Sequence, residues 1–393
     1  MKSIEIIFYV AAFVVFYTYI GYGILLYLLV RIKEALKKPQ SKTLPEHLPE
    51  VTMLIAAYNE QDIVQHKMTN TLLLDYPTQL LKIVWVTDGS TDSTNEHLKA
   101  YPQVEVLFNA PRQGKSAAVN RAMNFIHTPI VVFTDANTML CKEAIKEMVT
   151  EFTDPKVGCV AGEKRVSRPE LGNASSTEGA YWRYESLLKS LDYRLYSTVG
   201  AAGELFAIRT ELYVKLTSDT LLDDFVMSMT IAQRGYKIAY CQKAYAVESS
   251  SQDISQEAKR KVRIAAGGLQ SITRLYALLN PFRYGVLSFQ YISHRVLRWS
   301  VAPILFFALL PLNIILAWSY NWNWLYSVIL VLQLLFYALA TAGWMANKRQ
   351  IKNKLFFIPY YFLFMNLCVI EGFAYLRRHH GSGVWEKAQR NNG

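Results

Sequence analysis

Cysteine is scarce in this sequence, and its spacing excludes two classes of small domain. Four cysteines occur in 393 residues, and no two of them form a C-x-x-C pair. Zinc ribbons and zinc fingers need such pairs, and disulfide-stapled domains need a framework of paired cysteines. Sparse, unpaired cysteines are typical of a reducing compartment, where the polar part of the chain is therefore expected.

Charged residues are also few, and the chain is apolar for its length. Asp, Glu, Lys and Arg make up 19% of the residues, whereas hydrophobic residues make up 52%. Part of the chain is therefore expected in a lipid bilayer. The charges that are present are unbalanced, with 42 Lys and Arg against 31 Asp and Glu and a net charge of +11. This excess favours anionic partners such as lipid headgroups, nucleic acids or small anions.

Two long stretches contain no charged residue. The first, residues 6–30, covers about 37 Å as a helix, which is enough to cross a bilayer and too long for a cleaved signal peptide. Basic residues follow it, so its N-terminal end is expected outside the cytosol. The second, residues 299–347, is divided by a polar patch at 319–323 and predicts a hairpin of two transmembrane helices. Lysines and arginines follow this hairpin too, so both basic clusters are expected in the cytosol.

Two shorter apolar segments are expected to lie along the membrane surface. Residues 355–370 hold 16 uncharged residues before a basic tail, and a full crossing would place that tail outside. An interfacial or re-entrant helix is therefore predicted there, and another interfacial helix at 282–299, where aromatic residues mix with arginines. The sequence thus divides into an N-terminal transmembrane helix and basic linker (1–43), a cytosolic domain (44–277), and interfacial helices, a transmembrane hairpin and a basic tail (278–393). A multi-pass protein of a bacterial inner membrane is expected.

Residues 44–277 have a different pattern, in which short β-branched runs alternate with helical stretches. The apolar runs lie at residues 51–55, 83–86, 104–108 and 130–133. This alternation predicts an α/β fold with a mostly parallel sheet covered by helices. Ligands bind beyond the carboxyl ends of the strands in such sheets, and the polar motifs of this chain follow those ends.

Two of these motifs directly follow predicted strands. The alternate oxygen-bearing side chains of Asp135-Ala136-Asn137 can hold one hard cation such as Mg²⁺ or Mn²⁺, although the same pattern also forms Asx-turns. In Asp88-Gly89-Ser90-Thr91-Asp92, the first carboxylate can accept a hydrogen bond from a nucleobase or a ribose. The same segment can instead be a turn that caps the next helix.

Three further motifs carry charge at predicted helices. Gly114-Lys115-Ser116 is similar to part of a phosphate loop, but Asn109 stands where that loop needs a glycine, so a Walker site is excluded. Arg112 and Lys115 are then either diphosphate ligands at a helix start or solvated cations. Asp223-Asp224 opens another helix, either as a general base with an adjacent carboxylate or as acids that favour a first helical turn. A basic run faces either solvent or phosphate and comprises Lys259, Arg260, Lys261 and Arg263.

In this order, the motifs resemble the family-2 glycosyltransferases, in particular the membrane-bound branch that includes cellulose, chitin, hyaluronan and poly-N-acetylglucosamine synthases. The resemblance covers about residues 50–270 and rests on six segments: Ala57-Tyr58-Asn59-Glu60, Asp88 to Asp92, Gly114-Lys115-x-x-Ala118-x-Asn120, Asp135-Ala136-Asn137, Gly200-Ala201-Ala202-Gly203 and Asp223-Asp224. It implies a GT-A (Rossmann-like) catalytic domain, a nucleotide-sugar donor, most often a UDP-sugar, and a divalent metal, Mg²⁺ or Mn²⁺.

The resemblance also implies a role for each matching residue. Asp224 would be the catalytic base, and Asp135 and Asn137 would hold the metal. The acceptor side would be formed by Gly203, Glu204 and Asp223. The donor would be bound by a larger set: Ala56, Tyr58, Glu60, Asp88, Lys115, Asp135, Arg260 and Arg263.

Three departures from the family pattern bear on these roles. Asn137 offers a neutral oxygen where the D-x-D motif usually has a carboxylate, so either the affinity for the metal is lower or the diphosphate of the donor supplies the missing charge. The segment that corresponds to the T-E-D motif begins with Leu222 in place of threonine. Its last residue, Asp224, still supplies the acid that is the general base in the family. Ile264 stands where the Q-x-x-R-W motif of the synthases has its tryptophan, which weakens the inference to a polymer synthase.

The expected function is inverting transfer of a sugar from a nucleotide-sugar to a growing polysaccharide or glycan at the cytosolic membrane face. Two alternatives stay open. One is transfer of a single sugar to a polyprenyl phosphate or another lipid; the other is a non-catalytic nucleotide-sugar-binding scaffold, such as a partner in an export assembly. A nucleic-acid partner is not expected, because no nucleic-acid motif is present and the positive charge lies beside membrane segments.

Overall fold

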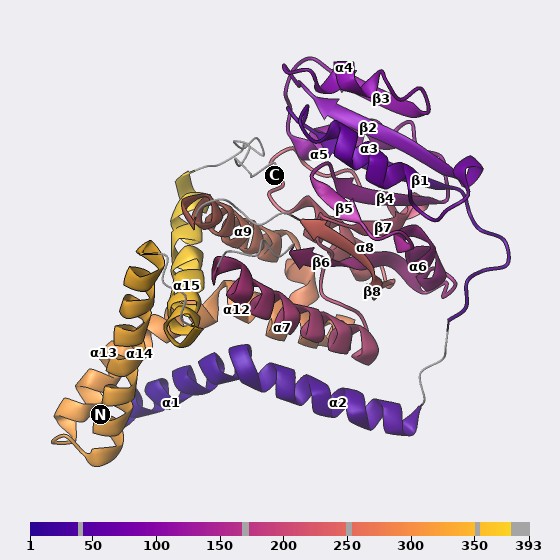
Figure 1. Cartoon of the computed structure of the whole chain (residues 1–393). Helices are drawn as coiled ribbons and strands as arrows, with labels where there is room; N and C mark the ends of the chain where they lie inside the picture. The colour runs from indigo at the N-terminus through magenta and orange to yellow at the C-terminus, as the bar shows by residue number, and fades with distance from the viewer. Residues whose placement is uncertain (38–41, 167–172, 249–253, 350–353, 379–393) are drawn as a thin grey trace.

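The computed structural model describes residues 1–37, 42–166, 173–248, 254–349 and 354–378. Its centre is an eight-stranded sheet in the order β3-β2-β1-β4-β7-β6-β8-β5 (Figure 1). The strands are β1 (Val51–Ala57), β2 (Leu81–Asp88), β3 (Val104–Asn109), β4 (Ile130–Asp135), β5 (Thr138–Leu140), β6 (Val157–Val166), β7 (Phe206–Arg209) and β8 (Lys237–Glu248).

The sheet has a parallel half and a mixed half. β1 pairs in parallel with β2 and with β4, and β2 pairs in parallel with β3, as the alternating pattern predicts. β7 runs antiparallel to β4 and β6, and β5 runs antiparallel to β8. β6 pairs in parallel with β8, so four of the seven strand pairings are parallel. The prediction of a mostly parallel sheet is therefore confirmed, although it did not include the antiparallel pairs. β7 and β5 have only four and three residues, and their partners are far away in the chain, so no local pattern indicates their direction.

Helices cover both faces of the sheet and form two separate cores. On one face, α3 (Val64–Leu72), α4 (Thr94–Leu98) and α6 (Ala144–Glu151) bury their apolar side chains against the strands. On the other face, α5 (Lys115–Met123) and α8 (Asp223–Gln233) do the same. Because successive side chains of a strand point to opposite faces, the central strands supply both cores and read as continuous apolar runs, as in β1, where six of the seven residues are buried.

A long N-terminal helix runs beside the α/β domain. α1 (Lys2–Phe16), a π-helical turn (Tyr17–Gly21) and α2 (Tyr22–Leu36) form one continuous helix of 35 residues. α2 packs on α7 (Asn173–Leu195), and α7 also contacts β6 and β8. In Figure 1, α7 accordingly lies between the sheet and the N-terminal helix.

Among the residues that the structure describes, four helices are long and apolar enough to cross a membrane. They are Lys2–Leu36, α13 (Val301–Ser319), α14 (Trp324–Lys348) and Leu355–Arg378 within α15 (Lys354–Arg378). The first three agree with the predicted N-terminal span and hairpin. The interfacial assignment of residues 355–370 was based on a short apolar run, but the helix continues through Glu371 to Arg378. Its length and composition are therefore compatible with a fourth crossing.

Polar side chains join these apolar helices to one another. Asn313 of α13 is fully buried and donates to the carbonyl of Tyr326, at 3.2 Å, and to Gln333 Oε1, at 3.0 Å, both in α14. Tyr19 donates from the N-terminal helix to Asn366 Oδ1 of α15, at 2.5 Å. Such interhelical hydrogen bonds fix the rotation of helices where hydrophobicity alone cannot.

The segment between the α/β domain and the hairpin is broken into short helices and partly buried. After α9 (Ile254–Arg274) come α10 (Pro281–Tyr284), α11 (Val286–Tyr291), a π-helical turn (Ile292–Val296) and α12 (Leu297–Trp299). Phe282 is fully exposed, as an interfacial segment requires, but Leu287, Tyr291 and His294 are buried within the protein. Two of the arginines that suggested a membrane surface, Arg295 and Arg298, bind Glu185 of α7 instead, whereas Arg283 is exposed. The domain limits at residues 43 and 277 stay predictions.

Candidate active site

The polar motifs meet at the carboxyl edge of the parallel strands. Ala56 of β1 is paired in register with Val86 of β2 and with Asp135 of β4. The segments that follow these strands therefore begin side by side at one edge of the sheet, where α/β folds bind their ligands. This arrangement agrees with the prediction that the strand-end motifs form one site.

The first two motifs are tied together by hydrogen bonds. Asn59 adopts a left-handed conformation, with φ of 53°, and its Oδ1 accepts from the Thr91 amide at 2.8 Å. The Asn59 amide donates to Ser90 Oγ at 3.1 Å, and the Glu60 amide donates to Thr94 Oγ1 at 2.8 Å. The loops after β1 and β2 therefore form one rigid wall. Tyr58 stands on this wall, and the Arg112 guanidinium lies 3.7 Å from the centre of its ring.

Asp88 is engaged with the protein itself. Its carboxylate accepts from the Gln113 amide at 3.0 Å and from the Gly114 amide at 2.7 Å, and the residue is 5% exposed. These bonds hold the start of α5, and with it Lys115, against the end of β2. The predicted contact of Asp88 with a nucleoside stays a prediction, and a nucleoside would have to use the carboxylate lone pairs that the backbone leaves free.

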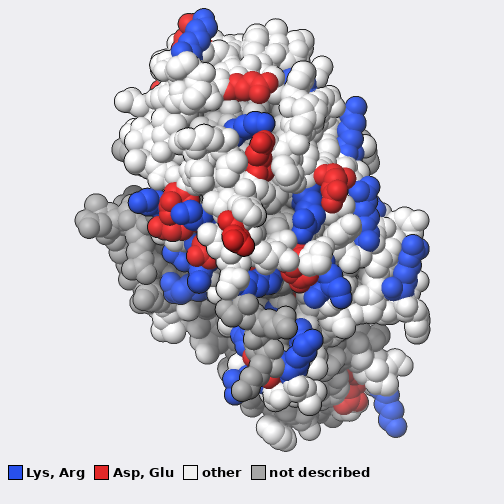
Figure 2. Space-filling model, turned by 90° about the vertical axis from the view of Figure 1, so that its right-hand side faces the viewer, with Lys and Arg blue, Asp and Glu red and all other residues white. Residues whose placement is uncertain are grey.

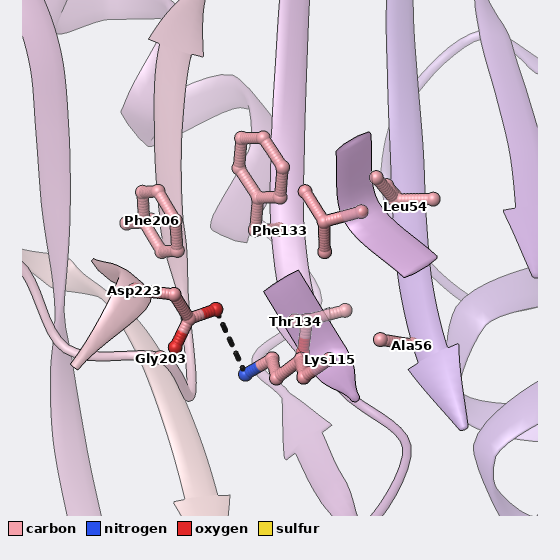
Figure 3. A pocket seen from close by; sticks show the side chains of 9 residues that line it. Leu54, Ala56, Lys115, Phe133, Thr134, Gly203, Phe206 and Asp223 are labelled. Atoms are coloured by element: carbon pink, nitrogen blue, oxygen red, sulfur yellow. Dashed lines mark ion pairs between the residues drawn. The ribbon is translucent and has the colours of Figure 1, made fainter. Parts of the chain in front are cut away.

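Lys115 is at the centre of the site. Its ammonium nitrogen lies 2.8 Å from Asp135 Oδ1 and 3.8 Å from Asp223 Oδ2. Burial would lower the pKa of this lysine, but the Asp135 and Asp223 carboxylates raise it above its ordinary value, so the side chain is a permanent cation. Figure 3 shows Lys115 and Asp223 pointing toward each other in a pocket that is also lined by Phe133, Phe206 and Leu54.

Asp224 differs from the other acids of the site. Burial, and then the neighbouring Asp223 carboxylate, raise the pKa of Asp224 to about 7, against the opposite effect of Lys115. Both acids lie in the first turn of α8, as predicted. A carboxyl group that changes charge near neutral pH is suited to take up a proton during a reaction.

A glycine-containing loop passes close to Asp224. A Cβ added to Gly203 would lie 3.5 Å from Asp224 Oδ2 and 3.3 Å from Lys115 Nζ. Gly200 has φ of 85°, and a Cβ there would lie 2.2 Å from the Phe225 ring. The loop is fixed to α8 by the Ala201 amide, which donates to Ser228 Oγ at 2.9 Å. The predicted acceptor-side Gly203 is thus next to the predicted base.

The predicted acceptor-side Glu204 belongs to a cluster of ion pairs. It binds Lys164, which is 7% exposed and also binds Glu248. Arg260, predicted to meet a diphosphate, lies 3.6 Å from Glu204 and 3.5 Å from Glu248. Neither Lys164 nor Glu248 was singled out from the sequence. Lys164 stands among other charged residues at the end of a β-strand pattern, and Glu248 is a single charge at the end of another.

Two more cations lie near Asp135. Lys67 of α3 is fully buried and donates to Thr134 Oγ1 at 3.0 Å and to the Thr138 carbonyl at 2.6 Å, on either side of the Asp135-Ala136-Asn137 turn. Burial lowers the pKa of Lys67 to about 7, against the opposite effect of Asp135. Burial, and then the Arg260 charge, lower the pKa of the second cation, Arg263, against the opposite effect of Asp223 and Asp135.

The structure allows a test of how well these residues fit a divalent metal. Asp135 is partly exposed and Asn137 is half-buried in the turn between β4 and β5. Within the described ranges, no group of three or more His, Cys, Asp or Glu residues is placed to hold a metal ion. Two oxygen ligands from protein fit a metal that arrives with a diphosphate and keeps several waters, which is common for Mg²⁺. Two such ligands do not fit a site in which the protein supplies every ligand of the metal.

The outer face of the domain carries both signs of charge. Figure 2 shows lysine and arginine side chains lying among aspartate and glutamate side chains on the face turned toward the viewer. Interspersed charges are typical of a solvated protein surface. The net charge of the chain is therefore not gathered into one broad basic patch on this face.

Comparison with known proteins agrees with this geometry. Residues 49–267 match the sequence model of the family described as "Glycosyltransferase like family 2". This chain belongs to that glycosyltransferase family. The match covers more than half of the chain and includes every motif named above, so the protein is an enzyme of the transferase class, as the resemblance implied.

Two curated relatives of this glycosyltransferase are polymer synthases. The poly-beta-1,6-N-acetyl-D-glucosamine synthase of Staphylococcus aureus strain MSSA476 is 27% identical over 288 residues, which cover 70% of this chain and 67% of that protein. The synthase of the same name from Staphylococcus epidermidis is 25% identical over 269 residues, which cover 64% and 62%. The glycosyltransferase is thus similar to synthases of poly-beta-1,6-N-acetyl-D-glucosamine.

One solved structure resembles nearly the whole glycosyltransferase. It is a mannosyltransferase from Pyrobaculum calidifontis, solved in complex with GDP-Man and Mn²⁺. It superposes with a TM-score of 0.69 over 95% of this chain and 99% of that chain, at 22% sequence identity. The likeness shows that the fold is GT-A with flanking helices, as the resemblance implied.

Proposed function

We propose that this enzyme transfers a sugar from a nucleotide-sugar, most plausibly a UDP-sugar, to a growing glycan at the cytosolic face of a membrane. The observation that carries the proposal is the Asp224 carboxyl group. It lies in a half-buried position beside Lys115 and Gly203, and its pKa is raised to about 7. A scaffold that only binds nucleotide-sugars has no need for such a group.

The reaction follows from the positions of the side chains. Asp224 accepts the proton of an acceptor hydroxyl while the hydroxyl oxygen forms a bond to the anomeric carbon and the bond to the donor diphosphate breaks. Lys115 and Arg263 place positive charge where the leaving diphosphate gains negative charge. A single displacement inverts the anomeric carbon, so an α-linked donor gives a β-linked product.

A divalent cation is part of this proposal. Asp135 and Asn137 would hold it, and the bound ion would supply additional positive charge to the leaving diphosphate. Lys115, now paired with Asp135 at 2.8 Å, is then available for the diphosphate or for Asp223. The mannosyltransferase that shares this fold was solved with Mn²⁺, which supports a metal of this class.

The proposed acceptor is a polysaccharide or glycan chain. The curated relatives are named as poly-beta-1,6-N-acetyl-D-glucosamine synthases, which favours an N-acetylhexosamine donor and a polymeric product. The second candidate is transfer of a single sugar to a polyprenyl phosphate or another lipid. It is favoured by Ile264, which takes the position of the synthases' tryptophan, and by the fold shared with a mannosyltransferase.

The proposed location is a multi-pass position in a bacterial inner membrane, with the catalytic domain in the cytosol. The apolar helices support the proposed position in a membrane. The basic residues that follow them support the proposed orientation, with the catalytic domain in the cytosol. Proposed partners are the nucleotide-sugar, the acceptor and the bilayer. Export or assembly proteins are proposed as further partners.

The deciding experiment supplies isolated membranes with a panel of radiolabelled nucleotide-sugars and reads the size of the product. Membranes that carry the Asp224→Asn variant are the matched control for endogenous enzymes. Label in a long product that only the wild-type membranes make supports polymer synthesis. Label in an organic-extractable product of one sugar supports the second candidate, and nucleotide binding without transfer to any acceptor contradicts both.

A further inference from the structure

A second cluster of charged residues lies away from the sheet edge, where α2, α7 and the π-helical turn at 292–296 meet. Asp192 and His294 are fully buried, Glu185 is 2% exposed and Arg295 is 9% exposed. The mechanism above uses none of these residues. Buried charges are costly to desolvate, so a cluster of this size calls for a specific reason.

Hydrogen bonds connect the cluster to the N-terminal helix. Tyr22 of α2 donates to Asp192 Oδ1, and His294 Nδ1 lies 2.6 Å from Asp192 Oδ2. Gln290 donates to the Asp192 backbone carbonyl at 2.8 Å. The Tyr22 side chain is itself fully buried, so α2 can keep this contact only in one position and one rotation.

Glu185 forms the other half of the cluster. It binds Arg295, lies 3.1 Å from Arg298 Nη1, and approaches His294 Nε2 at 3.4 Å. Burial would raise the pKa of the Glu185 carboxyl, but Arg295, His294 and Arg298 hold that pKa well below its usual range. The ion pairs therefore keep the guanidinium of Arg295 in a fixed place.

Arg295 links this cluster to the catalytic loop. Its Nε donates to the Val199 carbonyl at 3.3 Å. Val199 directly precedes Gly200, whose backbone lies against the Phe225 ring, and the loop continues to Gly203 beside Asp224. The contact fixes the start of the loop that brings the predicted acceptor-side Gly203 next to the predicted base.

A second contact path leads from Arg295 to the helix of the base. The Arg295 guanidinium lies 5.5 Å from the centre of the Trp299 ring. The Trp299 ring meets the Phe225 ring edge-on, with centroids 4.9 Å apart, and Phe225 follows Asp224 in the chain. Both paths begin at Arg295: one reaches Val199, at the start of the loop that leads to Gly203, and the other reaches Phe225, the residue after Asp224.

We propose that Arg295 is a positioning residue of the transfer reaction, which places the loop at 199–203 and Asp224 against each other only when the N-terminal helix is docked through Tyr22. The inference rests on the proposed function, because it assumes that Asp224 is the base. It adds that the membrane-anchored helix α2 takes part in assembling the active site.

The first test replaces Arg295 by lysine. The lysine keeps a cation for Glu185 but lacks the guanidinium Nε–H that donates to Val199. We expect kcat to fall by about 10- to 100-fold, because small displacements of reacting groups are costly, whereas the KM for the nucleotide-sugar stays within about twofold. The matched control is Arg283→Lys on exposed α10, which should leave both constants unchanged.

The second test removes only the hydroxyl of Tyr22. Tyr22→Phe should lower kcat by about threefold, and the matched control is Tyr27→Phe, a half-exposed residue of the same helix. Because both changes act through one path, the double variant Tyr22→Phe/Arg295→Lys should be no slower than Arg295→Lys alone. A merely structural role would instead give additive losses of melting temperature with wild-type kcat.

The outcomes separate this inference from the proposed function. Wild-type kcat in Arg295→Lys, or a donor KM that rises as much as kcat falls, overturns the positioning role. If Arg295→Lys does not fold, wild-type kcat in Tyr22→Phe overturns it alone. Activity in Asp224→Asn overturns the proposed function instead, whatever the Arg295 variants do.

Discussion

The sheet edge and the buried cluster beneath it both place carboxylates beside cations, but they differ in how fully these groups are paired. In the buried cluster, Asp192 and Glu185 are met by tyrosine, histidine and arginine side chains, and none of the four charged residues is more than 9% exposed. At the sheet edge, the Lys115–Asp135 pair is about one quarter to one third exposed, and Asp224 keeps a raised pKa.

This difference separates a part that holds position from a part that reacts. A buried carboxylate whose hydrogen-bond and ion-pair partners are all in place is held in one charge state and one geometry. A carboxyl group whose neighbours include another acid can gain and lose a proton near neutral pH. The two regions are joined through Arg295, so the fixed cluster can position the reactive one.

The largest effect is expected from a variant that disrupts the buried cluster around Glu185 and Asp192, which is the fixed region. Glu185→Gln leaves Arg295 and Arg298 buried without their counter-charge, and the free energy of unfolding should fall by about 3–5 kcal/mol. Glu34→Gln removes a comparable Arg194 ion pair at the protein surface and should cost less than about 1 kcal/mol. Thermal melting in detergent measures both. Equal losses in the two variants would mean that burial does not distinguish the regions.

The next largest effect is expected from a variant that disrupts the sheet edge around Lys115 and Asp224, which is the reactive region, without unfolding the protein. Lys115→Met removes the cation between Asp135 and Asp223, and kcat/KM should fall by about 10²- to 10³-fold, as for other groups that stabilise developing charge. Steady-state assays of product formation measure this, with Lys99→Met on the exposed surface as the control. Loss of the melting transition in Lys115→Met, rather than of rate, would assign the lysine to the fixed region.

A smaller effect sharpens the description of the metal site. Asn137→Asp restores the second carboxylate of a D-x-D motif, and the concentration of Mn²⁺ that gives half-maximal activity should fall by about tenfold. Asn124→Asp, an exposed change on the same domain, is the control for added negative charge. An unchanged metal requirement would place the ion away from Asn137.

The smallest effect is in the pH dependence. Asp224 accepts a proton only when it is ionised, and burial with the Asp223 carboxylate raises its pKa to about 7. kcat/KM should therefore fall as the pH drops through this value, with a loss of only about twofold between pH 8 and pH 7. An acid limb near pH 4, where an ordinary carboxyl titrates, would contradict the raised pKa.

Much of the reactive region could be predicted from the sequence, because strand ends and helix starts are local features. Asp135, Asp224 and Lys115 each follow a pattern of a few residues, and the sheet brings these patterns together as expected. Asp88 was found by the same reasoning, but its bonds to the Gln113 and Gly114 amides depend on how two loops fold together.

The fixed region could not be predicted, for a physical reason. Glu185 and Asp192 lie on a helix of mixed composition, where single acids usually face water. His294 and Arg295 lie in a segment whose aromatic and basic residues suggested a membrane surface, and only tertiary packing turns them toward α7. Lys67 was missed in the same way, since nothing nearby in the sequence shows that the lysine is buried beneath the Asp135 turn.

The most direct test of the account measures nucleotide-sugar binding and sugar transfer in purified Asp224→Asn. The variant keeps Lys115, Asp135 and the loops that hold the donor, so the Kd for the nucleotide-sugar should stay within about threefold of wild type. Transfer should fall by about 10³-fold or more, because the proton acceptor is lost. Near-normal transfer by this variant would contradict the assignment of Asp224 as the base and, with it, the proposed reaction.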